Sequence, residues 1–74
     1  MKSYSNLGGN SNVLAYESGR DYIKVKFMDN SIYTYTYGST GAQNILIMKK
    51  LASQGQGLNS FINTEVRQDY ASKE

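Results

Sequence analysis

The chain has 74 residues, with 8 lysines and arginines against 6 aspartates and glutamates, and it contains neither histidine nor cysteine. This composition excludes zinc sites built from histidine and cysteine, nucleophilic catalysis that depends on either residue, iron–sulfur clusters and disulfide bonds. The few carboxylates are scattered over predicted turns, helix surfaces and the tail, so no acid–base pair is expected. We therefore expect a non-enzymatic protein without a metal or a cofactor.

The length predicts one domain, because so short a chain cannot hold two. We place this domain at residues 13–70, between a flexible arm rich in serine, asparagine and glycine (1–12) and a frayed tail (71–74). We expect no membrane span and no signal peptide, and hence a cytoplasmic protein, in the host cytoplasm if a phage encodes it. So small a domain has a small core, and we therefore expect a homo-oligomer.

Three short runs after the arm have the pattern of β-strands, at residues 13–17, 21–28 and 31–37. Polar turn residues separate the runs, which predicts an antiparallel meander. Alternation in the middle run predicts one buried face and one open face. The buried face carries Ile23, Val25 and Phe27, and the open face carries Tyr22, Lys24, Lys26 and Met28.

The apolar spacing then becomes helical. Thr40 and Gln43 predict a capping box that starts a helix, and this helix is expected to end before Gly55. A second helical stripe runs from Leu58 to Tyr70. The predicted fold class is α+β, a three-stranded antiparallel meander followed by two helices packed on one face (β-β-β-α-α). The helices are expected to add Ile45, Met48, Leu51, Phe61, Ile62 and Val66 to the core.

Three groups of residues form a pattern that extends over nearly the whole chain. They are Phe27-x-x-Asn30-x-x-Tyr33-x-Tyr35, Ala52-Ser53-x-Gly55, and Phe61-Ile62-Asn63-x-x-Val66-Arg67-x-x-Tyr70. With this pattern the chain resembles the KTSC family, whose members occur at the C-terminus of some lysyl-tRNA synthetases and as free-standing bacterial or phage proteins. The resemblance implies a non-enzymatic domain with a suggested role in RNA binding. It also draws attention to the arginine beside the terminal asparagine, because guanidinium binds phosphate.

The chain departs from the family pattern at three places. Asn30 stands where a hairpin glycine is expected, the connector over residues 56–60 is longer, and Tyr37 adds a third tyrosine to the motif. Arg67 also has structural alternatives to a phosphate, namely an ion pair with Glu65 or Asp69, or a bond to the carbonyls of the glycine-rich connector.

The length of the loop after the second predicted strand decides where the tyrosines lie. A two-residue loop at Asp29 and Asn30 would place the tyrosines beside the lysines on the open face. Such a platform suits base stacking combined with phosphate contacts. Its members would be Tyr22, Lys24, Lys26, Tyr33, Tyr35 and Tyr37.

A three-residue loop with Asn30 in the left-handed conformation would instead place the rings beneath the helices. Val25 would then face Tyr33, and Ile23 would face Tyr35. We favour this register, because the other one would bury threonine hydroxyls in a small apolar core.

These observations favour a small binding protein for RNA or a nucleotide ligand. An alternative is a phage-type protein-interaction module that inhibits a host protein. Another is an oligomer that sequesters a nucleotide signalling molecule between protomers. The candidate ligand or nucleic-acid binding residues are Tyr22, Lys24, Lys26, Tyr33, Tyr35, Tyr37, Asn63 and Arg67.

Overall fold

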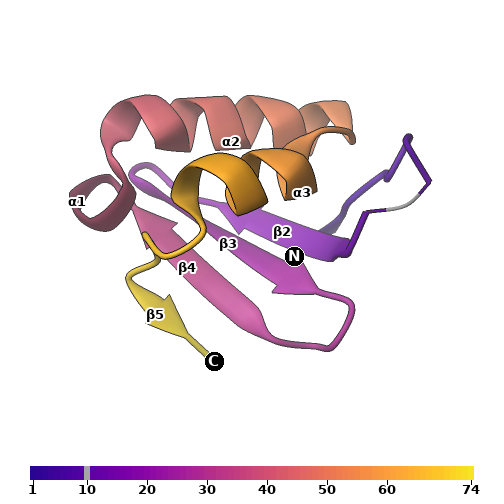
Figure 1. The fold of residues 1–74 in the computed structure, drawn as a ribbon, viewed down its shortest axis with the longest axis horizontal. Helices are drawn as coiled ribbons and strands as arrows, with labels where there is room; N and C mark the ends of the chain where they lie inside the picture. The colour runs from indigo at the N-terminus through magenta and orange to yellow at the C-terminus, as the bar shows by residue number, and fades with distance from the viewer. Residues whose placement is uncertain (10) are drawn as a thin grey trace.

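The computed structural model describes residues 1–9 and 11–74, which form one antiparallel sheet with helices on one of its faces (Figure 1). The strands lie in chain order in the sheet and are β1 (Lys2–Ser3), β2 (Val13–Ser18), β3 (Tyr22–Phe27), β4 (Ile32–Thr36) and β5 (Ser72–Lys73). The helices are α1 (Tyr37–Thr40), α2 (Ala42–Gln54) and α3 (Leu58–Phe61), and α3 continues into a π-helix, η1 (Ile62–Val66). The predicted α+β class is confirmed. No helix in the described ranges combines the length and the apolar character needed to cross a membrane.

The sheet has two strands more than predicted, one at each end of the chain. Lys2–Ser3 pair with β2 inside the arm where no strand was expected, and Ser72–Lys73 pair with β4 inside the expected tail. Backbone hydrogen bonds of 3.0 and 2.7 Å join Ile32 and Glu74 beyond β5. The predicted three-stranded meander is present as β2, β3 and β4, and the full sheet has one short strand more at each of its edges. The outer edges of β2 and β4 are therefore partly paired.

The β3–β4 hairpin has the three-residue register. Val25 pairs with Tyr33 and Ile23 pairs with Tyr35, as the favoured alternative required. Asn30 has a φ of 70°, in the left-handed region that asparagine tolerates. The register confirms that the tyrosines of β4 lie on the helix-covered face.

The helical region begins earlier than the sequence predicted. Thr36 and Ser39 form the capping box, and Tyr37 is the first residue of α1 rather than the last residue of a strand. The predicted capping box at Thr40 and Gln43 is wrong, because the Thr40 hydroxyl donates to the Asp69 carbonyl at 2.6 Å. The end of α2 at Gly55 is confirmed.

The second predicted helix is shorter than its apolar stripe. Helical backbone from Leu58 ends with η1, and the Asp69 amide then donates to the Val66 carbonyl at 2.9 Å. Tyr70 continues the four-residue spacing in sequence, but it packs against the core from a segment that leads into β5. The spacing therefore predicted burial correctly and helix length wrongly.

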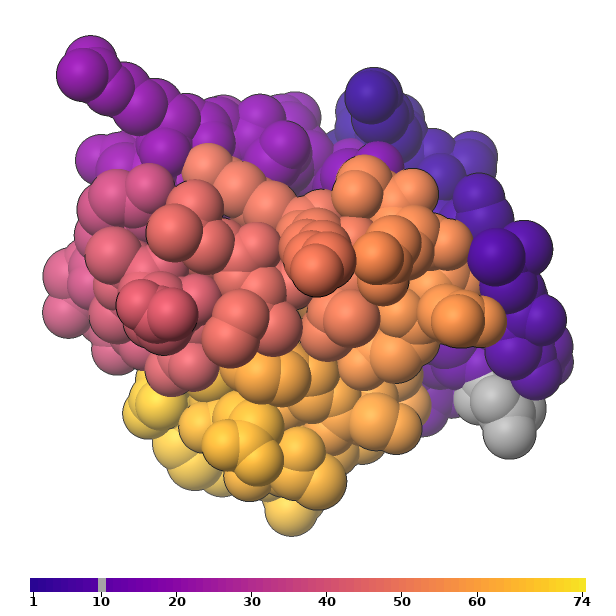
Figure 2. Space-filling model, turned by 90° about the horizontal axis from the view of Figure 1, so that it is seen from above, coloured from indigo at the N-terminus to yellow at the C-terminus, as the bar shows by residue number. Residues whose placement is uncertain are grey.

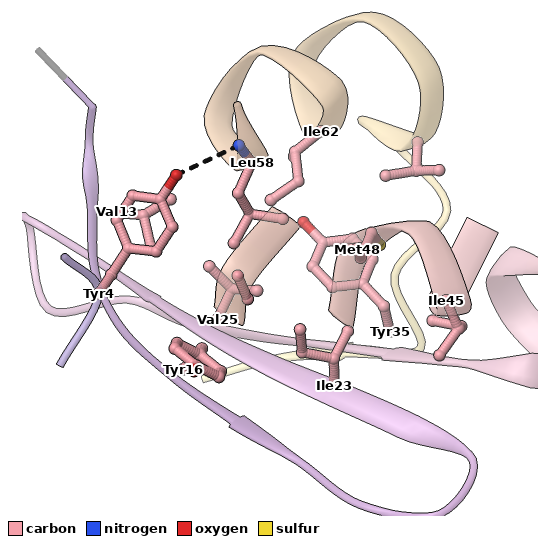
Figure 3. Close-up of a cluster of buried hydrophobic side chains, with 12 residues drawn as sticks. Tyr4, Val13, Tyr16, Ile23, Val25, Tyr35, Ile45, Met48, Leu58 and Ile62 are labelled. Atoms are coloured by element: carbon pink, nitrogen blue, oxygen red, sulfur yellow. Dashed lines mark hydrogen bonds between the residues drawn. The ribbon is translucent and has the colours of Figure 1, made fainter. Parts of the chain in front are cut away.

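The core lies between the sheet and the helices (Figure 3). Six predicted members are buried, Ile23, Val25, Ile45, Met48, Ile62 and Val66, whereas Phe27, Leu51 and Phe61 are only partly buried. The buried set also includes Tyr4, Val13, Tyr16, Tyr35, Ala52 and Leu58. Tyr4 contributes from the arm, and its hydroxyl accepts a hydrogen bond of 3.3 Å from the Leu58 amide.

The arm also contacts the end of α2, and Figure 2 shows the indigo N-terminal segment against the orange segment that follows this helix. Gly55 has a φ of 79°, and its carbonyl accepts a hydrogen bond of 2.7 Å from the Leu7 amide. A Cβ atom at this position would lie 2.6 Å from the Ser5 Cβ. This approach leaves no room for a side chain.

We expect Gly55→Ala to lower the free energy of unfolding by about 2–3 kcal/mol, because it combines left-handed strain with a clash. Gly41→Ala is the matched control, since Gly41 also has a positive φ, 96°, but a Cβ atom there would have nothing within 4 Å. Urea unfolding of both variants measures the difference. Equal losses would mean that the arm does not pack on Gly55 in solution.

Candidate functional site

The candidate residues occupy three separate places. Tyr33, Tyr35, Asn63 and Arg67 line one groove on the helix side of the sheet. Tyr22, Lys24 and Lys26 belong to the other face, and Tyr37 starts α1 away from both sets. The structure thus brings half of the predicted site together and separates the rest from it.

The groove has a volume of about 520 Å³ and lies between the tip of the β3–β4 hairpin and the α3–η1 segment. Aromatic side chains line one part of it, namely Phe27, Tyr33, Tyr35 and Tyr70. Side-chain amides line another, namely Asn12, Asn59, Asn63 and Gln68. Arg67 contributes the positive charge, while Asp29 and Ser31 come from the hairpin.

Tyr33 is the central ring of the aromatic part and contacts three other rings. Its ring centroid lies 5.3 Å from that of Phe27 and 4.9 Å from that of Tyr70, both nearly perpendicular, and 6.4 Å from the stacked ring of Tyr35. The Lys73 ammonium lies 5.3 Å from the Tyr33 centroid, and the Tyr33 side chain raises the pKa of Lys73. Edge-to-face and offset pairs are the favoured arrangements for such rings, so this wall is preorganised.

Tyr35 lies deepest among the groove-lining tyrosines, with 1% of its surface exposed. Burial raises the pKa of Tyr35, and the neighbouring Tyr33 and Tyr70 raise it further. The phenol therefore stays protonated across the physiological pH range. A neutral phenol both donates and accepts hydrogen bonds.

The polar wall comes from one side of the α3–η1 segment. Asn59, Asn63 and Arg67 follow each other at intervals of four residues, and the π-helical turn lies between the first and the last of them. Residues at this spacing share a helix face. π-helical turns are rare and occur frequently at functional sites. The segment thus presents two amides and a guanidinium to the groove.

Arg67 is exposed at the rim of the groove. Within residues 1–9 and 11–74 it has no ion pair with Glu65 or Asp69. The connector carbonyls of Gly55 and Gly57 accept hydrogen bonds from backbone amides. The guanidinium is therefore available to a ligand.

The open face of the sheet carries Lys24 and Lys26 but a single aromatic side chain from β3, Tyr22. The Tyr22 hydroxyl donates to the Glu17 carboxylate at 3.0 Å, and this bond raises the pKa of Tyr22. Glu17 also pairs directly with Lys24 across β2 and β3. The tyrosine–lysine platform of the two-residue register is not formed, because the β4 tyrosines point to the other face.

Tyr37 lies at the start of α1 with 39% of its surface exposed. The Lys49 ammonium lies 5.9 Å from its ring centroid and donates a hydrogen bond of 3.0 Å to the Arg20 carbonyl. These contacts place Tyr37 near the β2–β3 turn rather than in the groove.

The sequence interpretation did not include the amides of Asn12, Asn59 and Gln68 or the ring of Phe27 among the site residues. The four-residue spacing of Asn59 with Asn63 could have identified one of them. Asn12 and the hairpin reach the groove only through the fold: the Met28 amide donates to the Asn12 carbonyl at 2.8 Å.

Comparisons of the chain with protein-family models, curated proteins and solved structures found no match.

Proposed function

We propose that this protein is a small non-enzymatic binding protein whose groove takes a nucleotide-type ligand, a planar base that carries a phosphate. The observation that supports this most is the composition of the groove. Aromatic rings form one wall, and side-chain amides with one arginine form the other. From the residue pattern of the sequence we also propose that the chain is a KTSC-type domain.

The chemistry of each wall suits one part of such a ligand. Side-chain amides offer a donor and an acceptor together, which is the pattern along the edge of a nucleobase. Rings provide stacking contacts worth about 1–3 kcal/mol per base. Arg67 offers a planar fork for phosphate oxygens. The groove volume of about 520 Å³ lies in the usual range for small-molecule sites.

A nucleic acid on the open face is the less favoured version of the proposal. That face offers two lysines, but Glu17 lies opposite one of them and engages the hydroxyl of the one β3 ring. The protein-inhibitor and oligomeric alternatives stay predictions. The short strands β1 and β5 pair with part of β2 and of β4, which leaves less of these two strands free to pair with a second copy of the chain.

We expect Arg67→Gln to weaken binding of a nucleoside monophosphate about 10- to 100-fold, because it removes a charge-assisted hydrogen bond. Isothermal titration of a panel of the four ribonucleoside monophosphates at low salt measures this effect. Arg67→Lys keeps the charge without the fork and should recover only part of the affinity.

Lys24→Gln is the matched control, since it removes one positive charge from the opposite face. Its affinity for the monophosphates should stay within about 2-fold of wild type, because exposed charges this far away are screened. If no monophosphate binds and single-stranded RNA binds in a way that depends on Lys24 and Lys26, the open-face version replaces the groove. If neither binds, the proposed function is wrong.

A further inference from the structure

Tyr35 combines nearly complete burial with a polar group at the groove. Only 1% of the residue is exposed, and it lines the groove together with Ile62. Figure 3 shows its ring between β4 and the helical layer, with the hydroxyl oxygen turned toward Leu58 and Ile62. The hydroxyl therefore sits at the floor of the groove, beneath the π-helical segment.

This hydroxyl has no hydrogen-bond partner within the described ranges. Over the same ranges, every fully buried side-chain oxygen or nitrogen has a partner, so the Tyr35 hydroxyl must be accessible from the groove. Tyr4 provides the contrast, because it is similarly buried and its hydroxyl is bonded to the Leu58 amide. Buried polar groups cost free energy unless they are hydrogen-bonded.

The floor and the rim differ in charge. The floor presents a neutral phenol, since burial and the adjacent tyrosines raise the pKa of Tyr35. The rim presents the exposed Arg67 guanidinium. A phosphate at the rim stays hydrated and contacts the positive charge of Arg67. Burying the edge of an uncharged base at the floor costs less desolvation free energy than burying a phosphate there.

We infer that Tyr35 is a specificity-determining residue of the groove, whose hydroxyl hydrogen-bonds the edge of the base while Arg67 holds the phosphate at the rim. The inference rests on the proposed function and adds to it the direction in which the ligand lies. The bound ligand would enter base first.

The test compares Tyr35→Phe with Arg67→Gln on two probes, a nucleoside monophosphate that binds the wild type and the corresponding nucleoside. Tyr35→Phe should weaken both probes equally, by about 3- to 10-fold, because it removes one neutral hydrogen bond to the part that they share. Arg67→Gln should weaken the monophosphate and leave the nucleoside within about 2-fold. Tyr37→Phe is the matched control, since it deletes a phenol hydroxyl outside the groove.

A second measurement uses the wild-type protein alone, so it does not depend on whether a variant folds. Wild-type protein is titrated with purine riboside monophosphate, which lacks the exocyclic groups of the natural purine nucleotides. A loss of affinity of about 3-fold or more relative to the natural purine ligand supports contact with the base edge. Unchanged affinity overturns a hydrogen bond from Tyr35 to an exocyclic group and leaves the ring nitrogens as its partner, which the loss of affinity in Tyr35→Phe then has to show.

The outcomes separate the two proposals. If the wild type binds both probes and Tyr35→Phe binds them with the same affinities, the role of Tyr35 is overturned. The proposed function then still stands. A loss confined to the monophosphate overturns the direction of the ligand, because Tyr35 would then contact the phosphate. Absence of any nucleotide binding to the wild type overturns the proposed function and this inference together.

Discussion

Leu58→Ala is expected to lower the free energy of unfolding by about 2–5 kcal/mol, a large share of the stability of so small a domain. Leu58 is the first residue of α3, and its side chain is fully buried. It contacts the layer that carries Val25 and Tyr35 in Figure 3, so its removal leaves a cavity beneath the helix rather than a gap at the surface. Chemical unfolding followed by circular dichroism measures the loss.

Leu46→Ala provides the control for this substitution, because Leu46 lies on α2 with 55% of its surface exposed. The same atoms are deleted, and the expected cost is below about 1 kcal/mol. Similar losses for the two variants would contradict the packing of α2 and α3 on the sheet. We also expect Leu58→Ala to weaken ligand binding, because the next residue, Asn59, lies in the groove wall.

The central part of the fold was predictable because its signals are periodic. Alternation along β3 placed Ile23 and Val25 in the core, and helical spacing placed Ile45 and Met48 there. The same reasoning set the hairpin register, since the alternative would have buried threonine hydroxyls. Such patterns repeat over several residues and reflect burial directly.

The ends of the chain were not predictable in this way. A strand of two residues, such as Lys2–Ser3 or Ser72–Lys73, has no period to detect and exists only because a neighbouring strand offers free backbone groups. The start of the helical region was misplaced for a related reason. Thr36 and Thr40 are both suitable caps, and the tertiary hydrogen bond to the Asp69 carbonyl engages the second of them.

The candidate site was only partly predictable, because faces of a sheet can be read from the sequence but grooves cannot. Asn63 and Arg67 were singled out by the family pattern, and Tyr33 and Tyr35 by their position in β4. That these four residues share one groove depends on how η1 crosses the hairpin, which no local pattern encodes. Lys24 and Lys26 were candidates too, and the register that the sequence favoured places them on the face opposite to this groove.

Tyr4→Ala is expected to lower the free energy of unfolding by about 3–5 kcal/mol, the usual cost of deleting a buried aromatic ring. The prediction matters because Tyr4 belongs to the segment that composition alone marks as a flexible arm. Only 6% of Tyr4 is exposed, and the ring packs in the same core as Val13 and Leu58 (Figure 3). Chemical unfolding of this variant and of wild type measures the cost.

Tyr4→Phe and Leu7→Ala divide this effect into its parts. Tyr4→Phe keeps the ring and should cost about 0.5–1.5 kcal/mol, because it removes only the hydrogen bond of 3.3 Å from the Leu58 amide. It should also speed hydrogen exchange at that amide, which lies at the start of α3 and loses its acceptor. Leu7→Ala should cost less than about 0.5 kcal/mol, since 68% of Leu7 is exposed. If Tyr4→Ala has the same free energy of unfolding as the wild type, the arm does not pack on the core. The strand β1 would then have no anchor that holds it beside β2.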